Sequence, residues 1–169
     1  ESIKQFDRAL RCLDKALALE PHSADLWFQR GRILTGAGSL EEALRAYDSS
    51  LECTPENVRA WTARGELLIT LGRPEEAVHS FDTGLRFDRD NVDVLDGKRR
   101  ALKAMGRWDL LERVSAQIAA RDPTRVDAQF SRAEALVRLG RLPEAGQASD
   151  AVRARPPRSY DSLELRREA

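Results

Sequence analysis

The side chains best suited to acid–base, nucleophilic or metal chemistry are few in this 169-residue sequence and lie far apart. The two histidines, His22 and His79, fall at different positions of the repeat described below, and Cys12 and Cys53 form no CxxC pair. Metal and disulfide frameworks need closely spaced ligands of these types. We therefore predict neither framework, no metal and no cofactor, and we expect both histidines to be solvated.

Two pairs of adjacent glutamates, Glu41-Glu42 and Glu75-Glu76, are candidates for general acid–base chemistry. Each pair opens an amphipathic segment, where the positive end of a helix dipole favours acidic side chains. We interpret both pairs as helix starts. The sequence also contains no P-loop, no GxGxxG motif after a strand and no GxSxG motif. These observations predict that the chain is not an enzyme.

A basic run at 98–100, followed by Lys103, is a candidate contact for nucleic acid or an acidic partner. Asp93 and Asp96 lie one turn earlier and offset the run through i,i+4 pairing. Trp108 is the only aromatic residue nearby, so a platform for base stacking is poorly supported. The whole chain carries 28 basic and 28 acidic side chains. We therefore predict a solvated helix face and no nucleic-acid partner.

The elements that carry these residues repeat every 34 positions. The pattern of each unit predicts two amphipathic helices. Small residues such as Gly65 and Ala77 allow close helix packing. Gly72 suits a left-handed conformation at a helix end, and Pro74 suits the first turn of the next helix. The columns are Trp27, Trp61 and Leu95; Gly31, Gly65, Arg99 and Ala133; Gly38, Gly72, Gly106 and Gly140; Ala43, Ala77, Leu111 and Ala145; Tyr47, Phe81, Ser115 and Ser149; and Pro21, Pro55, Arg89, Pro123 and Pro157.

These columns resemble the tetratricopeptide repeat family. The family pattern is met in one unit by Trp27, Gly31, Leu34, Ala43, Tyr47 and Pro55. The resemblance implies an all-α fold without strands, a right-handed α-solenoid of antiparallel helix pairs. The pentatricopeptide class, which binds RNA through similar helical pairs, fits less well because the columns differ and net positive charge is absent.

The repeat divides the chain into one array, residues 1–169. We predict a second helix of a partial repeat at 3–21, full repeats at 24–57, 58–91, 92–125 and 126–159, and at 160–169 the first helix of a further repeat or a cap. The third repeat departs most, with Arg99, Leu111 and Ser115 in place of a small residue, alanine and an aromatic. Leu111 and Ser115 suggest an exchange of volume within one contact, and we expect this repeat to be the softest.

In the family, first helices line a concave groove that holds peptides, and the resemblance implies the same use here. Phe28 and Phe130 share one column, where each is either a binding hot spot or packs sideways on a neighbouring repeat. The predicted groove residues are Phe28, Arg32, Arg59, Thr62, Glu66, Ile69, Asp93, Asp96, Arg100, Lys103, Phe130, Glu134 and Arg138.

One departure from the family pattern argues against two specialised uses of the groove. Co-chaperone members grip a terminal carboxylate with a Lys/Asn/Arg clamp, and sugar-nucleotide transferase arrays use an asparagine ladder. The corresponding column, Gln29, Ala63, Gly97 and Ser131, contains no asparagine and no basic residue. We therefore predict a non-catalytic scaffold that binds a peptide or partner protein. The alternatives are a scaffold that forms homo-oligomers through the solenoid ends and a regulatory segment of a larger multidomain enzyme.

The sequence contains no apolar run of about 18 residues and begins without a signal peptide. These features predict no membrane partner and a cytoplasmic location. The first residue is not methionine and the array starts in mid-repeat, so we expect the chain to be a fragment of a longer array.

Overall fold

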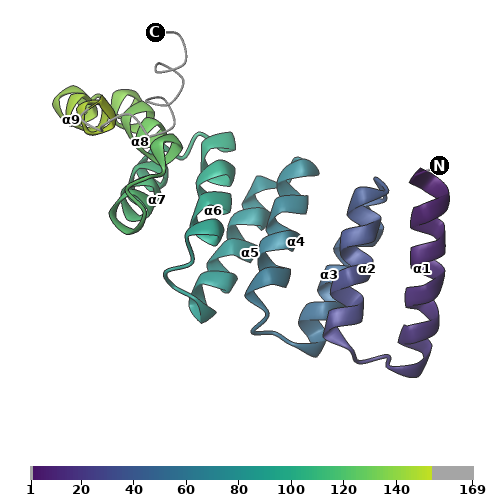
Figure 1. Cartoon of the computed structure of the whole chain (residues 1–169). Helices are drawn as coiled ribbons and strands as arrows, with labels where there is room; N and C mark the ends of the chain where they lie inside the picture. The colour runs from purple at the N-terminus through teal and green to yellow at the C-terminus, as the bar shows by residue number, and fades with distance from the viewer. Residues whose placement is uncertain (1, 154–169) are drawn as a thin grey trace, which may run out of the picture. The chain divides into compact units, whose positions relative to one another are not determined.

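The computed structural model describes residues 2–153, and every regular element in that range is a helix (Figure 1). The all-α prediction is therefore confirmed. The predicted helix at 160–169 lies outside the described residues. The helices are α1 (Ser2–Leu19), α2 (Ala24–Gly36), α3 (Leu40–Cys53), α4 (Val58–Thr70), α5 (Pro74–Phe87), α6 (Val92–Ala104), α7 (Trp108–Arg121), α8 (Val126–Arg138) and α9 (Leu142–Arg153).

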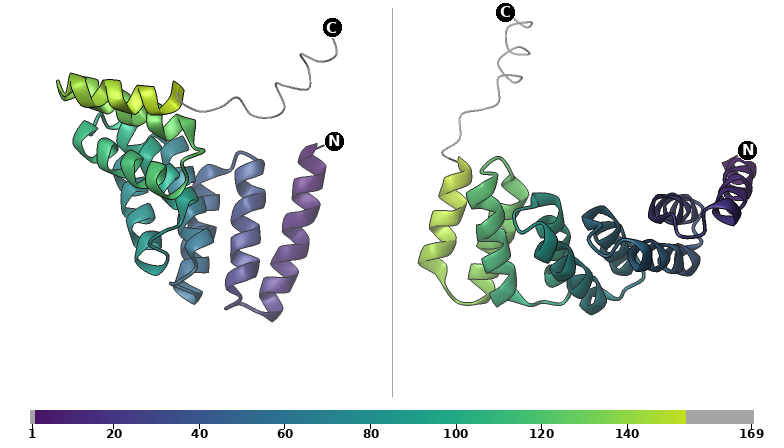
Figure 2. Two further views of the ribbon diagram at one scale, coloured as in Figure 1. Left: turned by 60° about the vertical axis from the view of Figure 1, so that its left-hand side comes forward. Right: turned by 90° about the horizontal axis from the view of Figure 1, so that it is seen from below.

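The chain divides into two compact units, residues 1–107 and 108–169. In the first unit, α2 packs on α3 and α4 packs on α5, while α3–α4 and α5–α6 contacts join one pair to the next. Further contacts connect α2 with α4 and α4 with α6 (Figure 2). This alternation is that of an all-α solenoid. The border between the units falls inside the predicted third repeat, since α6 belongs to the first unit and α7 to the second.

Glycine ends the first helix of each pair, as the sequence predicts. Gly72 has φ of 71°, and its N–H donates to the carbonyl of Ile69 at 3.0 Å while the N–H of Arg73 donates to that of Leu68 at 2.8 Å. These two bonds form a Schellman motif, which satisfies carbonyls at the helix end. Pro74 then begins α5. Gly38, Gly106 and Gly140 also have positive φ.

Small residues let the two helices of a pair approach closely. A Cβ atom added to Gly65 would lie 2.6 Å from the Phe81 ring, and one added to Gly31 would lie 2.6 Å from the Tyr47 ring. In α6 the corresponding column holds Arg99, while Gly97, two positions earlier, approaches the Phe81 ring of the preceding repeat, because a Cβ added to Gly97 would also meet that ring. The ring of Phe81 is thus held between α4 and α6.

Residues of the tryptophan column hydrogen-bond to residues of the proline column. The Nε1 atom of Trp61 donates to the carbonyl of Pro55 at 2.7 Å, and that of Trp27 donates to the carbonyl of Pro21 at 2.9 Å. Each indole therefore ties the start of a repeat to the turn that precedes it. Trp27 and Trp61 also pack against the apolar core of the first unit.

A ladder of ion pairs, which our reading of the sequence missed, joins consecutive repeats. Its members are 16 positions apart. Arg64 also donates to the hydroxyl of Ser80 at 2.7 Å, so one guanidinium connects α3, α4 and α5. The three pairs are Arg30–Asp14 at 3.3 Å, Arg64–Asp48 at 2.7 Å and Lys98–Asp82 at 2.5 Å.

The second unit packs around a smaller apolar cluster formed by Ala133, Leu136, Ala145 and Ala148. Leu111 and Ser115 are both fully buried. Among the described residues, the hydroxyl of Ser115 has no hydrogen-bond partner. Arg132 occupies the repeat position of Arg30, Arg64 and Lys98, and it donates to Glu112 at 3.1 Å. Glu112 lies four positions before residue 116, where the 16-residue spacing of the other pairs would place the partner.

Candidate functional site

A groove crosses the face of the first unit that is formed by α2, α4 and the start of α6. It consists of two adjoining hollows of about 390 and 510 Å³, which we call the α2-side and the α6-side hollow. Both are within the size range of ligand sites, and Phe28, Ala63 and Glu66 line both. The α2-side hollow adds Arg32, Thr35, Tyr47, Leu67 and Thr70; the α6-side hollow adds Val58, Arg59, Thr62, Asp88, Asn91 and Asp93.

The floor of the groove is apolar and rigidly packed. Phe28 is 5% exposed, and its ring centroid lies 5.8 Å from that of Tyr47. Phe28 therefore packs on Tyr47 of its own repeat, and Arg59 of the neighbouring repeat lies over its ring. Phe130, in the same column of the second unit, is 58% exposed. One column thus holds a core residue in one unit and a surface residue in the other.

The phenol of Tyr47 is the polar end of this floor. Its hydroxyl lies 3.3 Å from the Thr35 hydroxyl, which itself donates to the carbonyl of Gly31 at 2.9 Å. Burial raises the pKa of Tyr47, an effect only partly opposed by the Thr35 hydroxyl and the charge of Arg32. The phenol is therefore neutral near pH 7 and contributes a hydrogen-bonding group, not a charge.

Two arginines on the groove have no carboxylate partner among the described residues. Arg59 places its guanidinium carbon 5.1 Å from the centroid of the Phe28 ring, a cation–π contact. Arg32 makes only a long contact, 3.4 Å, to the side-chain oxygen of Gln29. Both side chains are exposed. Their guanidinium N–H groups are not taken up by a carboxylate among the described residues, so both residues can donate to a bound molecule.

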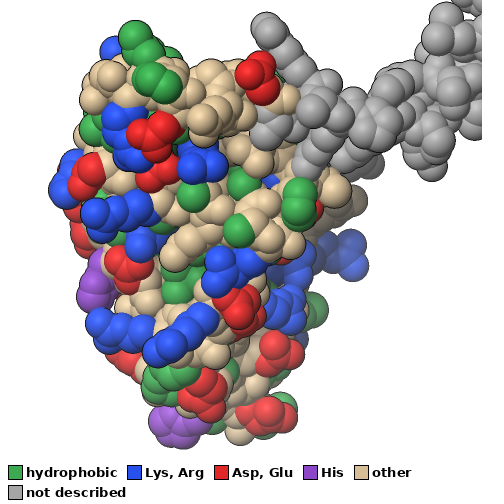
Figure 3. Space-filling view, turned by 90° about the vertical axis from the view of Figure 1, so that its left-hand side faces the viewer, with side chains coloured by type: hydrophobic (Ala, Val, Ile, Leu, Met, Phe, Trp, Pro, Cys, Tyr) green, Lys and Arg blue, Asp and Glu red, His purple; other side chains and the backbone are tan. Residues whose placement is uncertain are grey.

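The other charged groove residues are engaged within the protein. Arg100 donates to Glu66 and lies 3.4 Å from Asp96, which also accepts from Arg99 at 2.8 Å. Lys98 pairs with Asp82, so the three basic residues at 98–100 each face a carboxylate, and Asp96 provides the offset that we predicted. Over the face shown in Figure 3, basic side chains likewise lie among acidic ones.

The structure brings together six of the predicted groove residues and leaves seven outside the two hollows. Ile69 packs against the core of the first unit, and Arg138 lies over Trp108 in the second, 5.2 Å from its ring centroid. The six residues that line the groove are Phe28, Arg32, Arg59, Thr62, Glu66 and Asp93. The seven others are Ile69, Asp96, Arg100, Lys103, Phe130, Glu134 and Arg138.

Sequence reasoning missed Asp88 and Asn91, which reach the groove from the turn between α5 and α6. The prediction included only residues on the first helix of each repeat, whereas this turn directly precedes such a helix. The signal was present, because Asn91 is the N-cap of α6 and its side chain accepts from the N–H groups of Asp93 and Val94. An N-cap asparagine fixes the position of the adjoining turn.

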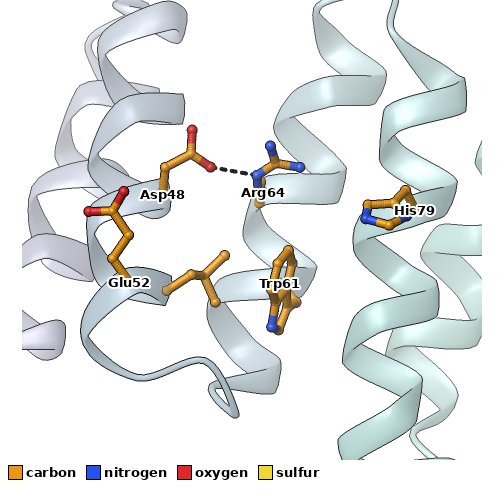
Figure 4. A pocket seen from close by; sticks show the side chains of 6 residues that line it. Asp48, Glu52, Trp61, Arg64 and His79 are labelled. Atoms are coloured by element: carbon orange, nitrogen blue, oxygen red, sulfur yellow. Dashed lines mark hydrogen bonds and ion pairs between the residues drawn. The ribbon is translucent and has the colours of Figure 1, made fainter.

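A further hollow lies on the opposite side of α4, lined by Asp48, Leu51, Glu52, Trp61, Arg64 and His79. Its side chains come from α3, α4 and α5, and Figure 4 shows the Asp48–Arg64 pair at one edge and His79 alone on α5. Glu52 also lines a neighbouring hollow that contains His22 and Trp27. Within the part of the chain that the structure describes, no three His, Cys, Asp or Glu side chains are grouped so as to hold a metal ion.

Comparison with known proteins identifies the repeat. One family model described as "Tetratricopeptide repeat" matches residues 4–58 and 100–159, and a second with the same description matches residues 34–101. The chain belongs to the tetratricopeptide repeat family. The recognition made from the Trp, Gly, Ala and Pro columns is thereby confirmed. The comparison with curated proteins found no match.

Several solved structures share the tetratricopeptide repeat fold of this chain. One is "Crystal structure of YrrB: a TPR protein with an unusual peptide-binding site", with a TM-score of 0.78 and 20% identity over 98% of this chain and 86% of that one. Another is "Crystal structure of MamA", with a TM-score of 0.81 and 15% identity over 97% and 92% of the two chains. At such identity the likeness shows the fold alone. Among the described helices, none is long and apolar enough to span a membrane.

Proposed function

We propose that this chain is a non-catalytic scaffold that binds a peptide or an extended segment of a partner protein in the groove of the first unit. The observation that carries the proposal is the continuity of the two hollows, which share Phe28, Ala63 and Glu66. A continuous hollow with an apolar floor and polar rim suits an extended chain better than a compact small molecule.

Three further features support a binding role. The chain belongs to a family built on helical repeats that present extended surfaces. YrrB, a structural neighbour, is described as having a peptide-binding site. Arg32 and Arg59 offer N–H donors at the rim that no carboxylate among the described residues occupies. Exposed arginines beside an aromatic floor are typical of interface hot spots.

The test is to select peptides on the wild-type protein from a random phage-displayed library and to measure their affinity by fluorescence polarisation. Ala63→Arg fills the groove where the two hollows meet, and we expect it to weaken the selected peptides at least tenfold. Thr62→Arg blocks only the α6-side hollow and serves if Ala63→Arg unfolds. Ala18→Arg, at an exposed position of α1 that lines neither hollow, is the matched control and should leave binding unchanged.

Failure to select any peptide would overturn the scaffold function in this form. Equal affinity for wild type, Ala63→Arg and Thr62→Arg would instead show that peptides bind elsewhere, for example in the hollow around Trp61, and would overturn the groove assignment. Circular dichroism melts of each variant establish that a lost affinity is not a lost fold.

The second unit favours another candidate function, association between copies of the chain. Phe130, Val137 and Leu142 are 58%, 53% and 62% exposed, more than the interior of a repeat array usually leaves. Sedimentation velocity over a wide concentration range tests this candidate. A strictly monomeric protein would exclude it, whereas an oligomer that Phe130→Ser and Val137→Ser dissociate would support it.

A further inference from the structure

Glu52, in the last turn of α3, lines two neighbouring hollows outside the groove. The hollow around Trp61 has a volume of about 430 Å³ and the hollow around Trp27 one of about 600 Å³. Both indole side chains are half-buried. Figure 4 shows Glu52 beside Asp48 on one helix, with Trp61 on the next. None of the residues that line these two hollows lines the groove, so the two surfaces are separate.

The carboxylate of Glu52 is free. Its side chain is exposed, and it makes no hydrogen bond and no ion pair within residues 2–153. Asp48, one turn earlier on the same helix, is paired with Arg64 at 2.7 Å, so the charges of these two residues cancel. Glu52 therefore gives the surface shared by the two hollows an uncompensated negative charge.

The ladder of ion pairs explains why Glu52 has no cation beside it. In each pair of the ladder, an aspartate on the second helix of a repeat contacts a basic residue 16 positions later. The position 16 residues after Glu52 holds Leu68, which is apolar and 0% exposed. The repeat positions equivalent to Glu52 hold Ala18 and Arg86. The carboxylate is thus neither part of the repeat pattern nor a link between two repeats.

The ladder also shows how this surface holds a guanidinium. The guanidinium carbon of Arg64 lies 6.0 Å from the centroid of the Trp61 ring, while its Nε pairs with Asp48. The preceding repeat has the same arrangement, formed by Arg30, Trp27 and Asp14. Arginine suits such a place because its planar guanidinium pairs with a carboxylate through its edge and packs on an aromatic ring with its face. Glu52 offers a further carboxylate next to the same two indoles, without an arginine.

We propose that Glu52 and the two hollows bind an arginine side chain from a partner protein. The guanidinium pairs with the Glu52 carboxylate, and the methylene groups lie against the indole of Trp27 or Trp61. The partner thus supplies the cation that the chain itself does not place there. A lysine fits less well, because its ammonium is compact and strongly hydrated and lacks a planar face. Because this surface is separate from the groove, the inference goes beyond the proposed function and makes the chain a scaffold for two ligands.

The experiment compares three blocked pentapeptides that differ only in the central residue, which is flanked by glycine and serine. This residue is arginine, lysine, or citrulline, which has the shape of arginine without its charge. Binding is followed by NMR through the indole N–H signals of isotope-labelled protein, at about pH 7.5, above the usual titration range of histidine, and at low ionic strength, where exposed charges are least screened. Trp108, in the second unit, is the internal reference. We expect the arginine peptide to bind about threefold to fivefold more tightly than the citrulline peptide, with the lysine peptide between them.

Glu52→Gln removes the charge and keeps the shape of the side chain. We expect the arginine and citrulline peptides to bind this variant equally. Glu42→Gln is the matched control, because Glu42 is an exposed residue of the same helix and lines neither hollow. It should keep the wild-type preference, and circular dichroism melts verify the fold of both variants.

Ala63→Arg separates this inference from the groove function. It fills the groove and leaves the two hollows open, so the arginine peptide should bind it as it binds wild type; Thr62→Arg serves if Ala63→Arg unfolds. Weaker binding to the blocked variant would place the peptide in the groove and overturn the inference. Failure to select any groove peptide from the library would overturn the groove function and leave this inference intact.

The remaining outcomes decide the role of Glu52. A preference for arginine over citrulline that Glu42→Gln keeps and Glu52→Gln loses, with shifted signals of Trp27 or Trp61, supports the inference. No detectable binding of the arginine peptide, equal affinities on wild type, a preference that survives Glu52→Gln, or an equally large shift of the Trp108 signal would each overturn it.

Discussion

Arg64 and Asp48 join two consecutive repeats through one bond, with the Nε of Arg64 2.7 Å from Oδ1 of Asp48. The arginine side chain is 18% exposed and the aspartate 43%, so the pair lies at the edge of the helix interface. The same guanidinium reaches Ser80 on α5. The contact therefore orients α4 relative to the helices on both sides of it.

This geometry predicts a measurable coupling between the two side chains. In a double-mutant cycle of Asp48→Asn and Arg64→Met, we expect a coupling free energy of about 0.5–1.5 kcal/mol, the range for a partly exposed, hydrogen-bonded ion pair. The measurement is urea unfolding followed by circular dichroism. Arg59 lies on the same helix without a carboxylate partner among the described residues, so a cycle of Asp48→Asn and Arg59→Met should give a value near zero. Equal coupling in both cycles would contradict the prediction.

The close approach of Gly65 to Phe81 predicts that Gly65→Ala destabilises the protein. The added Cβ atom would lie 2.6 Å from a fully buried ring, and overpacking of this kind costs about 1–3 kcal/mol. Gly146 is the matched control, because an added Cβ there meets nothing within 4 Å. Gly146→Ala should stabilise by up to about 1 kcal/mol through helix propensity. Opposite shifts in thermal midpoint are expected, and a stabilising Gly65→Ala would disprove the packing argument.

We expect replacement by alanine to change the free energy of unfolding in opposite directions at two buried serines. Ser115 and Ser50 are both 0% exposed, but the Ser50 hydroxyl donates to the carbonyl of Ala24 at 2.8 Å, whereas that of Ser115 has no partner among the described residues. Ser115→Ala should raise the free energy of unfolding by about 1 kcal/mol, since it removes an unsatisfied polar group. Ser50→Ala should lower it by about 1 kcal/mol. Loss of stability in Ser115→Ala would reveal a hydrogen bond at that position.

The pair formed by Arg73 and Glu76 predicts a pH effect at the start of α5. Hydrogen bonds from the Arg73 guanidinium, at 2.6 and 2.7 Å, lower the pKa of Glu76. Because the folded pKa is lower than the unfolded one, the pair's contribution to stability is present above the unfolded value of about 4.3 and is lost as the pH falls through the folded value. Carboxyl NMR titration should show the Glu76 pKa rising in Arg73→Gln. Glu144, which pairs with Arg141, should titrate unchanged, and a Glu76 pKa that does not move would refute the assignment.

The sequence predicted those features that depend on one residue type in one local setting. Gly72 could be recognised as a helix end because a left-handed conformation requires little beyond glycine at the right offset. The ion pair of Arg64 and Asp48 could be predicted in the same way, since both residues recur as a basic and an acidic residue in the earlier and later repeats, but the predicted columns did not include these two. Charged columns deserve the same comparison when they recur in register.

Features that depend on the neighbouring repeat could not be predicted in this way. Phe28 and Phe130 share a column, yet Phe28 is buried where Arg59 lies over its ring, and Phe130 is exposed. Similarly, the close approach of α6 to the Phe81 ring of the preceding repeat is made by Gly97, which lies outside the small-residue column of Gly31, Gly65 and Arg99. Both outcomes depend on which side chain the adjacent helix presents, and the repeat pattern of a single column does not contain that information.

The position of the Phe81 ring limits where this protein can be truncated. The side chain comes from α5, but it fills space against Gly65 on α4 and Gly97 on α6. A fragment that stops at residue 91, the formal end of its repeat, would expose one side of that ring to water and should unfold or aggregate more readily. The smallest fragment that contains α5 and folds on its own must therefore extend through α6. The structural units suited to truncation or grafting are thus offset by one helix from the units of the sequence repeat.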